Sequence, residues 1–272
     1  MAEMAESAEA LFKAGRLRDA IEAQNAVVRK NPLDQDARYL LFVFLCQAGD
    51  LERAEKQLGA LADQDDRSRS GSLVYHGLLS AEWERRKVYE RDGRPTLPPD
   101  SPAFLLRRVE ALERLRAGDE AGASERIDRA IETTPGCPGK LNGEAFQDLR
   151  DYDDVLGSVI EIFAGGRYIW MPLTRIRRLS FPEPRTALDT LWRPAKLVDT
   201  GGQTADIHVP VLYQPSYAQD HDAVRLGHMT DWQARGDLYT GVGQHLWLAV
   251  RGDERFEESL MDVRQLELDA AG

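Results

Sequence analysis

Histidine and aspartate residues gather in one segment of the C-terminal half. The segment QDHDAVRLGHMTDW carries two histidines and three aspartates within a few residues: His221, His228, Asp220, Asp222 and Asp231. Imidazole nitrogens and carboxylate oxygens are the groups with which a metal hydrolase holds and activates its ion. His208 and His245 lie in the same half and add to this pattern. A hydrolase site that uses these residues is therefore one hypothesis.

The spacing of these residues also has a simpler interpretation. It matches no standard metal-ligand signature, and Asp220–Asp222 falls where a surface loop is expected, which is commonly acidic and polar. There is no G-x-S-x-G nucleophile motif, and neither cysteine has a histidine nearby in sequence. The Gly-rich stretches GGRY and GVGQ lack the Lys-Ser or Lys-Thr of a phosphate loop and are typical of turns. On this interpretation the chain has no catalytic residue, metal or cofactor.

The N-terminal half contains a repeat. LFKAGRLRDA at 11–20 recurs as LCQAGDLERA at 45–54, with leucine, alanine and glycine at matching positions. Each copy predicts a helix that ends near an alanine, a glycine in the left-handed conformation, and a second helix with apolar residues at helical spacing. A helix pair that recurs every 34 residues has the period of tetratricopeptide repeats. Such hairpins stack because neither can bury its apolar face alone.

A third, degenerate hairpin is predicted around Ala117 and Gly118, since Gly118 precedes Pro135 by the distance that separates Gly15 from Pro32. A long helix with Val74 and Val88 lies before it, followed by the proline-rich stretch GRPTLPPDSP, an extended loop or linker.

The helix after Pro32 has a second apolar stripe. Tyr39, Phe42 and Val43 lie off the face that the repeat must bury. A helix that is apolar all round is either sandwiched within its own chain or shows one side to a partner. Both interpretations stay open. If a partner binds here, these three residues are the first candidates for its contact site.

The second half has a different amino-acid composition and a different hydrophobic pattern. A helix is predicted first, with Leu149, Leu156 and Phe163 along one face. Short stretches rich in aromatic and β-branched residues then predict antiparallel strands: RYIWMP, AKLVD, DIHVPVLY, HLWLAV and, last, LMDVRQLELD. The prediction is an α+β protein, with tetratricopeptide-like hairpins in a helical domain over 1–143. A connecting helix and a small antiparallel β domain, with a partly closed barrel as one shape open to it, then fill 144–272.

Composition and charge narrow the classes of partner. The 272 residues carry a net charge of -11, which argues against nucleic acid or an anionic membrane as the main partner. No stretch approaches the ~18 apolar residues of a membrane span. The start, MAEMAESAEALF, lacks the basic and apolar regions of a signal peptide. These features predict a cytoplasmic protein.

Several segments together resemble a known family. RDYDDVLGSVIEIFAGGRYIWMPL, LWRPA, PVLYQPS, RLGHMTDW, GVGQH and LMDVRQLEL occur in the order found in the ImpE family, also called TagJ. The resemblance extends to the two repeat turns and so covers nearly the whole chain. Residues 146–150 and 221–222 depart from the family pattern.

The resemblance implies a function. ImpE proteins are accessory proteins of the bacterial type VI secretion system. The family likeness implies an adaptor that binds the N-terminal helix of the small sheath subunit (TssB), and it suggests the Clp-type unfoldase (ClpV) that recycles the sheath as a second partner. The alternative is the metal-dependent hydrolase described above.

Overall fold

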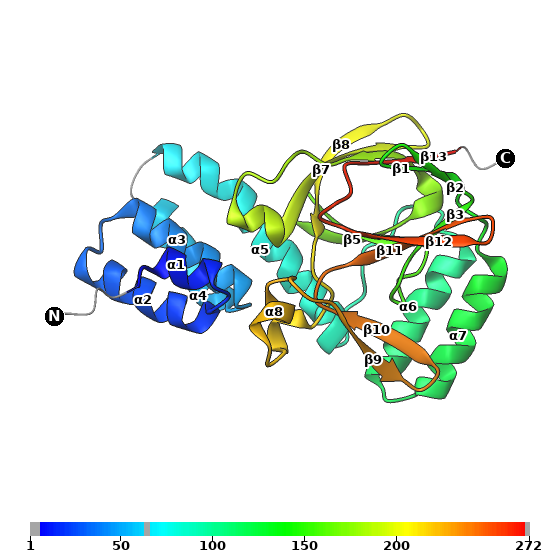
Figure 1. Ribbon diagram of the computed structural model, residues 1–272, viewed down its shortest axis with the longest axis horizontal. Coiled ribbons are helices and arrows are strands. Elements are labelled where there is room, and N and C mark those ends of the chain that lie inside the picture. Colours follow the sequence, from blue (N-terminus) through cyan, green and yellow to red (C-terminus); the bar gives the residue numbers. More distant parts are fainter. Residues whose placement is uncertain (1–5, 63–65, 270–272) are drawn as a thin grey trace.

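The computed structural model describes residues 6–62 and 66–269. Residues 1–5, which bear on the signal-peptide prediction, lie outside this range. Helices dominate the first half and antiparallel strands the second, so the predicted α+β class is confirmed. Figure 1 shows the blue N-terminal helices gathered at one end of the molecule and most of the strands at the other. The long helix α5 runs between them.

The first four helices form the two predicted hairpins: α1 (Ala8–Lys13), α2 (Leu17–Lys30), α3 (Gln35–Gln47) and α4 (Leu51–Ala62). Gly15 and Gly49 close α1 and α3 in the left-handed region, with φ of 76° and 71°. The side chains of Ser7 and Asp34 accept backbone N–H groups at the starts of α1 and α3. The repeat therefore encodes two helical turns of the same geometry, as its spacing predicts.

The third hairpin is present but does not stack on the first two. It consists of α6 (Ala103–Arg116) and α7 (Glu120–Thr133), joined through Gly118 at φ 78°. Figure 1 shows it beside the strands, away from α1–α4. The helix between them, α5 (Asp66–Glu90), packs on α4 at one end and on the strands at the other. The long helix that joins the two halves is thus α5.

Most strands belong to one eight-stranded antiparallel sheet with the order β2-β1-β13-β6-β7-β8-β4-β5. Its members are β1 (Gly139–Leu141), β2 (Glu144–Phe146), β4 (Val159–Ala164), β5 (Arg167–Pro172), β6 (Ile176–Ser180), β7 (Trp192–Asp199), β8 (Thr204–Pro210) and β13 (Gln265–Leu268). A three-stranded sheet, β12-β11-β3, faces it, and a separate hairpin extends toward α6 and α7. These are β3 (Asp148–Asp151), β11 (Leu246–Arg251), β12 (Glu254–Ser259), β9 (Asp231–Arg235) and β10 (Leu238–Val242). Between the two sheets lies an apolar core of aliphatic and aromatic side chains from both.

The connecting helix predicted over Leu149–Phe163 is wrong. These residues form β3, a turn, and β4. Every residue from Val159 to Phe163 is buried, which is the pattern of a strand covered on both faces rather than of an amphipathic helix. Gly157 allows the turn at φ 47°, and its Cα lies against the guanidinium of Arg108, where a Cβ would clash at 2.5 Å.

The two halves share one core. It begins at α1 and continues through α3, α4 and α5 to Val159, Trp170, Trp192 and Tyr213 of the β half. Helix α7 ends at Thr133 and β1 begins at Gly139, so strands start before the predicted boundary at residue 143. The assignment of 1–143 and 144–272 as separate domains stays a prediction.

Candidate functional site

The histidines and aspartates that suggested a hydrolase do not form a site. Asp222, at the start of the short helix α8 (Asp222–Arg225), accepts the N–H of Leu17 at 3.2 Å and pairs with Arg225 at 3.5 Å. Asp231 accepts the backbone N–H that follows it. His221 and His228 are exposed. Within residues 6–62 and 66–269, no three His, Cys, Asp or Glu side chains are placed to hold a metal ion. Asp222 instead connects the β half to the first hairpin.

The second apolar stripe of α3 lies within the chain. Phe42 is 0% exposed and Val43 is 3% exposed. Tyr39 is half-buried, and its hydroxyl lies 3.1 Å from that of Tyr75 on α5. Of the three candidate contact residues, only Tyr39 offers surface to a partner. Their role in binding stays a prediction, and for Phe42 and Val43 it requires α3 and α5 to separate.

A buried chain of charged groups crosses the junction between α5 and the strands. Arg85 donates two hydrogen bonds to Glu161, at 2.9 and 2.5 Å. Glu161 lies 3.2 Å from Nε2 of His245, whose Nδ1 is 2.8 Å from Asp151. Tyr213 donates to Asp151 at 2.6 Å and its ring lies 3.9 Å from the imidazole. The groups alternate in sign, so each charge has an opposite neighbour.

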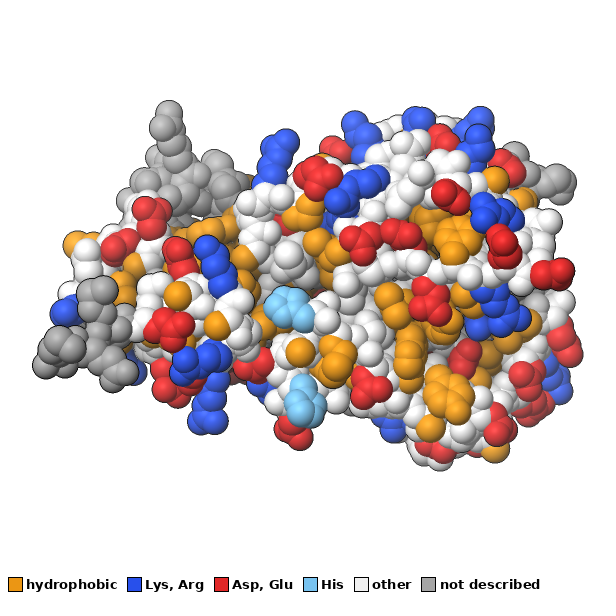
Figure 2. All heavy atoms as spheres, in the orientation of Figure 1, with side chains coloured by type: hydrophobic (Ala, Val, Ile, Leu, Met, Phe, Trp, Pro, Cys, Tyr) orange, Lys and Arg blue, Asp and Glu red, His pale blue; other side chains and the backbone are white. Residues whose placement is uncertain are grey.

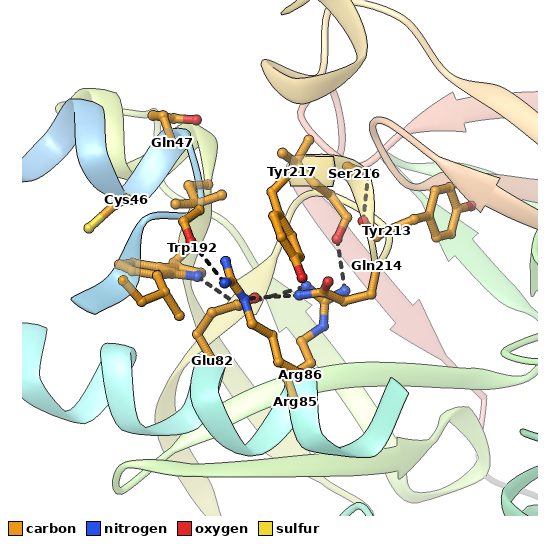
Figure 3. A pocket seen from close by; sticks show the side chains of 14 residues that line it. Cys46, Gln47, Glu82, Arg85, Arg86, Trp192, Tyr213, Gln214, Ser216 and Tyr217 are labelled. Atoms are coloured by element: carbon orange, nitrogen blue, oxygen red, sulfur yellow. Dashed lines mark hydrogen bonds and ion pairs between the residues drawn. The ribbon is translucent and has the colours of Figure 1, made fainter. Parts of the chain in front are cut away.

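Glu82 extends this network toward the first hairpins. Its carboxylate accepts hydrogen bonds from Nε1 of Trp192 at 3.2 Å and from Nε2 of Gln214 at 2.5 Å. Arg86 donates to the carbonyl of Gly49 at 2.8 Å, which attaches α5 to the turn of the second hairpin. Figure 3 shows these side chains converging on one small cavity.

The environment shifts the pKa values of these groups. Burial alone would lower the pKa of His245, but Asp151 and Glu161 outweigh it and raise the pKa to about 9. Burial opposes ionisation of Glu161, yet Arg85 and His245 hold the pKa of this carboxyl well below its usual range. Burial, followed by repulsion from Asp151, raises the pKa of Asp153 to about 7. His245 is therefore an imidazolium held between two carboxylates.

Two of the cavities that these groups line are small. The cavity among Glu82, Arg86 and Gln214 measures about 20 Å³, and the one beside His245 about 10 Å³. About 10–15 Å³ is what a single water molecule needs. The buried network links α5 to the strands, and a third cavity of about 240 Å³ opens at its edge, beside Asp153 and Gln214.

A larger groove opens beside the first hairpin. It has a volume of about 520 Å³ and lies between α1 and the rim of the β half. Its walls are Phe12 and Lys13 of α1 and the 3-10 turn η2 (Ala187–Thr190). Four further segments complete them, with the residues Val211, Leu226, Gly227, His228, Gln244, Ser259, Met261 and Asp262. Figure 2 shows hydrophobic side chains at the surface on both sides of this junction, with histidines close to it. A volume of this size is in the range of ligand-binding clefts.

Comparison with known proteins identifies the family. Residues 143–267 match the family described as ImpE protein, and residues 11–74 match a tetratricopeptide repeat family. The chain is 30% identical to the type VI secretion system accessory component TagJ of Pseudomonas aeruginosa over 96% of this chain and 91% of that protein. The chain belongs to the ImpE family. The family resemblance of the sequence segments is thereby confirmed.

A solved structure has the same fold. The crystal structure of protein VPA1032 from Vibrio parahaemolyticus matches with a TM-score of 0.88 and 24% identity, covering 96% of this chain and 97% of that one. Across the part of this ImpE chain that the structure describes, no helix is both long and apolar enough to cross a membrane.

Sequence reasoning missed most of the site. The sequence shows His245 only as one of several histidines, and the predicted helix includes its partners Asp151 and Glu161. A glutamate within the apolar run VIEIFA was the available signal, because a charged residue inside a buried strand needs a partner. The groove has no sequence signal, since its walls come from segments up to 250 residues apart.

Proposed function

We propose that this protein is a non-enzymatic adaptor of the type VI secretion system that binds a helix of the small sheath subunit, TssB. The observation that carries the proposal is the groove of about 520 Å³ beside the stacked hairpins. Support comes from the similarity to the accessory component TagJ and from the repeat family matched at 11–74. Tetratricopeptide-like stacks commonly present such surfaces to peptides and helices.

The binding mode is helix-in-groove, in which apolar side chains at i, i+3, i+4 and i+7 of the guest enter the groove. A few such contacts give micromolar affinity, about -8 kcal/mol. That affinity suits a cytoplasmic factor that must release the sheath. The Clp-type unfoldase is the second partner we propose, and nucleic acid is not a partner of a chain with a net charge of -11.

The test is a titration of the full-length protein into a fluorescently labelled peptide. The peptide spans the N-terminal helix of the small sheath subunit encoded in the same genome, and a scrambled peptide of the same composition is the control. Saturable micromolar binding of the native peptide alone supports the proposal. Equal binding of both peptides, or of neither, refutes the sheath subunit as partner, and the unfoldase is then tested in the same assay.

Metal analysis of the purified protein tests the proposal that it is not a metal-dependent enzyme. We expect the purified protein to hold no stoichiometric metal, because Asp222 is engaged with Leu17 and Arg225, and no three His, Cys, Asp or Glu side chains of the described residues are placed to hold an ion. One metal ion per chain that is lost in both His221→Ala and His228→Ala would favour the hydrolase.

A further inference from the structure

Strand β12 forms an open edge of the three-stranded sheet. The order of that sheet is β12-β11-β3, so β12 pairs with β11 on one side, and among the described residues no strand pairs with its other side. Figure 1 shows β12 at the opposite end of the molecule from α1–α4. An unpaired edge presents backbone N–H and C=O groups to which a further strand can bond.

The pairing with β11 decides which backbone groups of β12 are free. The two strands are joined by a two-residue turn at 252–253, and the N–H of Leu260 donates to the carbonyl of His245 at 2.9 Å. Because hydrogen-bonded residues alternate along an antiparallel strand, the even-numbered residues of β12 bond to β11. The odd-numbered residues Arg255 and Glu257 therefore direct their N–H and C=O groups to the open edge.

A groove of about 630 Å³ lies along this strand. Residues 254–258 of β12 line it, together with Leu141, Asn142 and Glu144 from the hairpin of β1 and β2. Phe256 is half-buried and packs against the core between the two sheets. Side chains alternate between the faces of a strand, so the glutamates at 254 and 258 share the face of Phe256. An added strand would bring its side chains closest to these three residues, since they would not be hydrogen-bonded to it.

The charged residues that line the groove are more often acidic than basic. They are Glu144, Glu254, Glu257 and Glu258, against Arg251 and Arg255. Arg251 already pairs with Glu144 at 3.2 Å and with Glu254 at 2.9 Å. The groove therefore carries an excess of negative charge.

Glu258 is the carboxylate of the groove that most needs a cation. Burial, followed by repulsion from Asp262, raises the pKa of Glu258, and the arginine that opposes this shift, Arg264, pairs with Glu183 at 2.8 Å. Asn142 donates a long hydrogen bond to Glu258, at 3.4 Å. A positive side chain from outside would compensate this carboxylate. Charges on an edge strand disfavour guests of like charge, so they also restrict which strand can add here.

We propose that the open edge of β12 is a docking site for an extended, basic segment of a protein partner, which adds as a further strand by bonding to the backbone of Arg255 and Glu257. Alternate guest residues then lie opposite Glu254, Phe256 and Glu258. The guest consequently has the pattern basic-x-apolar-x-basic. This interaction goes beyond the proposed function, because it recognises a strand and not a helix.

Three peptides test the proposal with the full-length protein. The first is fluorescently labelled Thr-Lys-Thr-Val-Thr-Lys-Thr, which has the predicted pattern. The second has glutamates in place of the two lysines. The third keeps the lysines but is N-methylated at the two threonines that flank the valine, which removes the backbone donors that would face Arg255 and Glu257. Thus the second peptide tests the charge and the third tests the backbone pairing.

We expect saturable binding of the lysine peptide. The glutamate peptide should bind about tenfold more weakly, with a difference that shrinks at high salt, because the attraction is between exposed charges. N-methylation should weaken binding about tenfold, because two hydrogen bonds are lost. No binding of the lysine peptide, equal binding of the glutamate peptide, or equal binding of the N-methylated peptide would each overturn the proposal.

Variants of the protein locate the site, and each has a matched control. Glu257→Pro removes an N–H that faces the open edge, and Glu257→Ala removes the same side chain but keeps the N–H; proline is tolerated on an edge strand. Glu258→Gln removes the carboxylate without changing its shape, and Glu132→Gln makes the same change at an exposed position of α7. Thermal melts check each fold.

Glu257→Pro should weaken binding of the lysine peptide about tenfold relative to Glu257→Ala, and Glu258→Gln about threefold relative to Glu132→Gln. If folded Glu257→Pro and Glu258→Gln bind as their controls do, the peptide binds elsewhere and the proposal is wrong. Self-association of the wild type that Glu257→Pro abolishes and the lysine peptide does not displace would assign the edge to a second copy of the chain, and would also overturn it. These assays contain no sheath peptide, so their failure leaves the proposed function standing.

Discussion

Raising the pH above neutrality should lower the free energy of unfolding of this protein, because a single buried histidine loses its proton. His245 lies between Asp151 and Glu161, at 2.8 and 3.2 Å, with a side chain that is 6% exposed. Burial opposes its charge, but the two carboxylates raise its pKa to about 9, from an ordinary value of 6.5. The folded protein therefore holds a proton that the unfolded chain releases near neutral pH.

The sign and size of the effect follow from this difference. A pKa that is higher in the folded state stabilises the fold fully below pH 6.5, and the stabilisation is lost as the pH rises through about 9. At 1.36 kcal/mol per pKa unit, a difference of about 2.5 units corresponds to about 3 kcal/mol, of which about 2 kcal/mol should disappear between pH 6 and pH 8.5. Asp153, whose pKa is raised to about 7, acts in the same direction as the pH approaches 7.

Urea unfolding of the wild type and of His245→Gln at pH 6 and pH 8.5 measures the effect. The variant keeps a hydrogen-bond donor but cannot titrate, so its loss of stability over this interval should be smaller than that of the wild type by about 2 kcal/mol. Equal losses in the two proteins, or a wild type that is more stable at pH 8.5, would show that His245 is not the charged centre of the network.

Three further predictions concern packing. Leu45→Ala should lower the free energy of unfolding by about 2–5 kcal/mol because Leu45 is 0% exposed, whereas Leu33→Ala, at 79% exposure, should cost less than about 0.5 kcal/mol in the same urea assay. Gly49→Ala should lower the free energy of unfolding more than Gly15→Ala does, although both positions have positive φ. At position 49 the new Cβ would lie 2.6 Å from the side chain of Tyr217, whereas at position 15 it would have no neighbour within 4 Å. Residues 1–132 expressed alone should be molten, since α5 would expose its buried charges, and a sharp calorimetric transition of that fragment would contradict this.

The helical hairpins could be predicted from sequence because their signals are local. The glycines at 15, 49 and 118 mark each turn, and the apolar spacing of the flanking segments is helical. The position of the third hairpin could not be predicted, because stacking depends on which surface α5 leaves free rather than on the hairpin's own residues. Five of the strands were indicated by their aromatic and β-branched composition.

The sequence predicts a helix where the strands β3 and β4 lie, because a helical and a strand periodicity coincide in this segment. Leu149, Leu156 and Phe163 recur at helical spacing, and the run from Val159 to Phe163 is equally consistent with a strand buried on both faces. Gly157, which adopts a positive φ, is the residue in this segment whose type favours an interruption of the predicted helix. Pairing with β5 and β8, which local sequence does not encode, decides the outcome.

The buried network and the groove predict that the halves of this protein act as one unit. Arg85 comes from α5 and Glu161 from β4, and separating them would leave two opposite charges without compensation in an apolar core. The same junction fixes α1 relative to Met261, so the groove has a defined width only while both halves are docked. A guest that contacts both walls binds the docked state alone and must stabilise it. Saturating sheath peptide should thus raise the unfolding temperature of the whole chain in one transition, and two separate transitions with only the first shifted would show that the halves are not coupled.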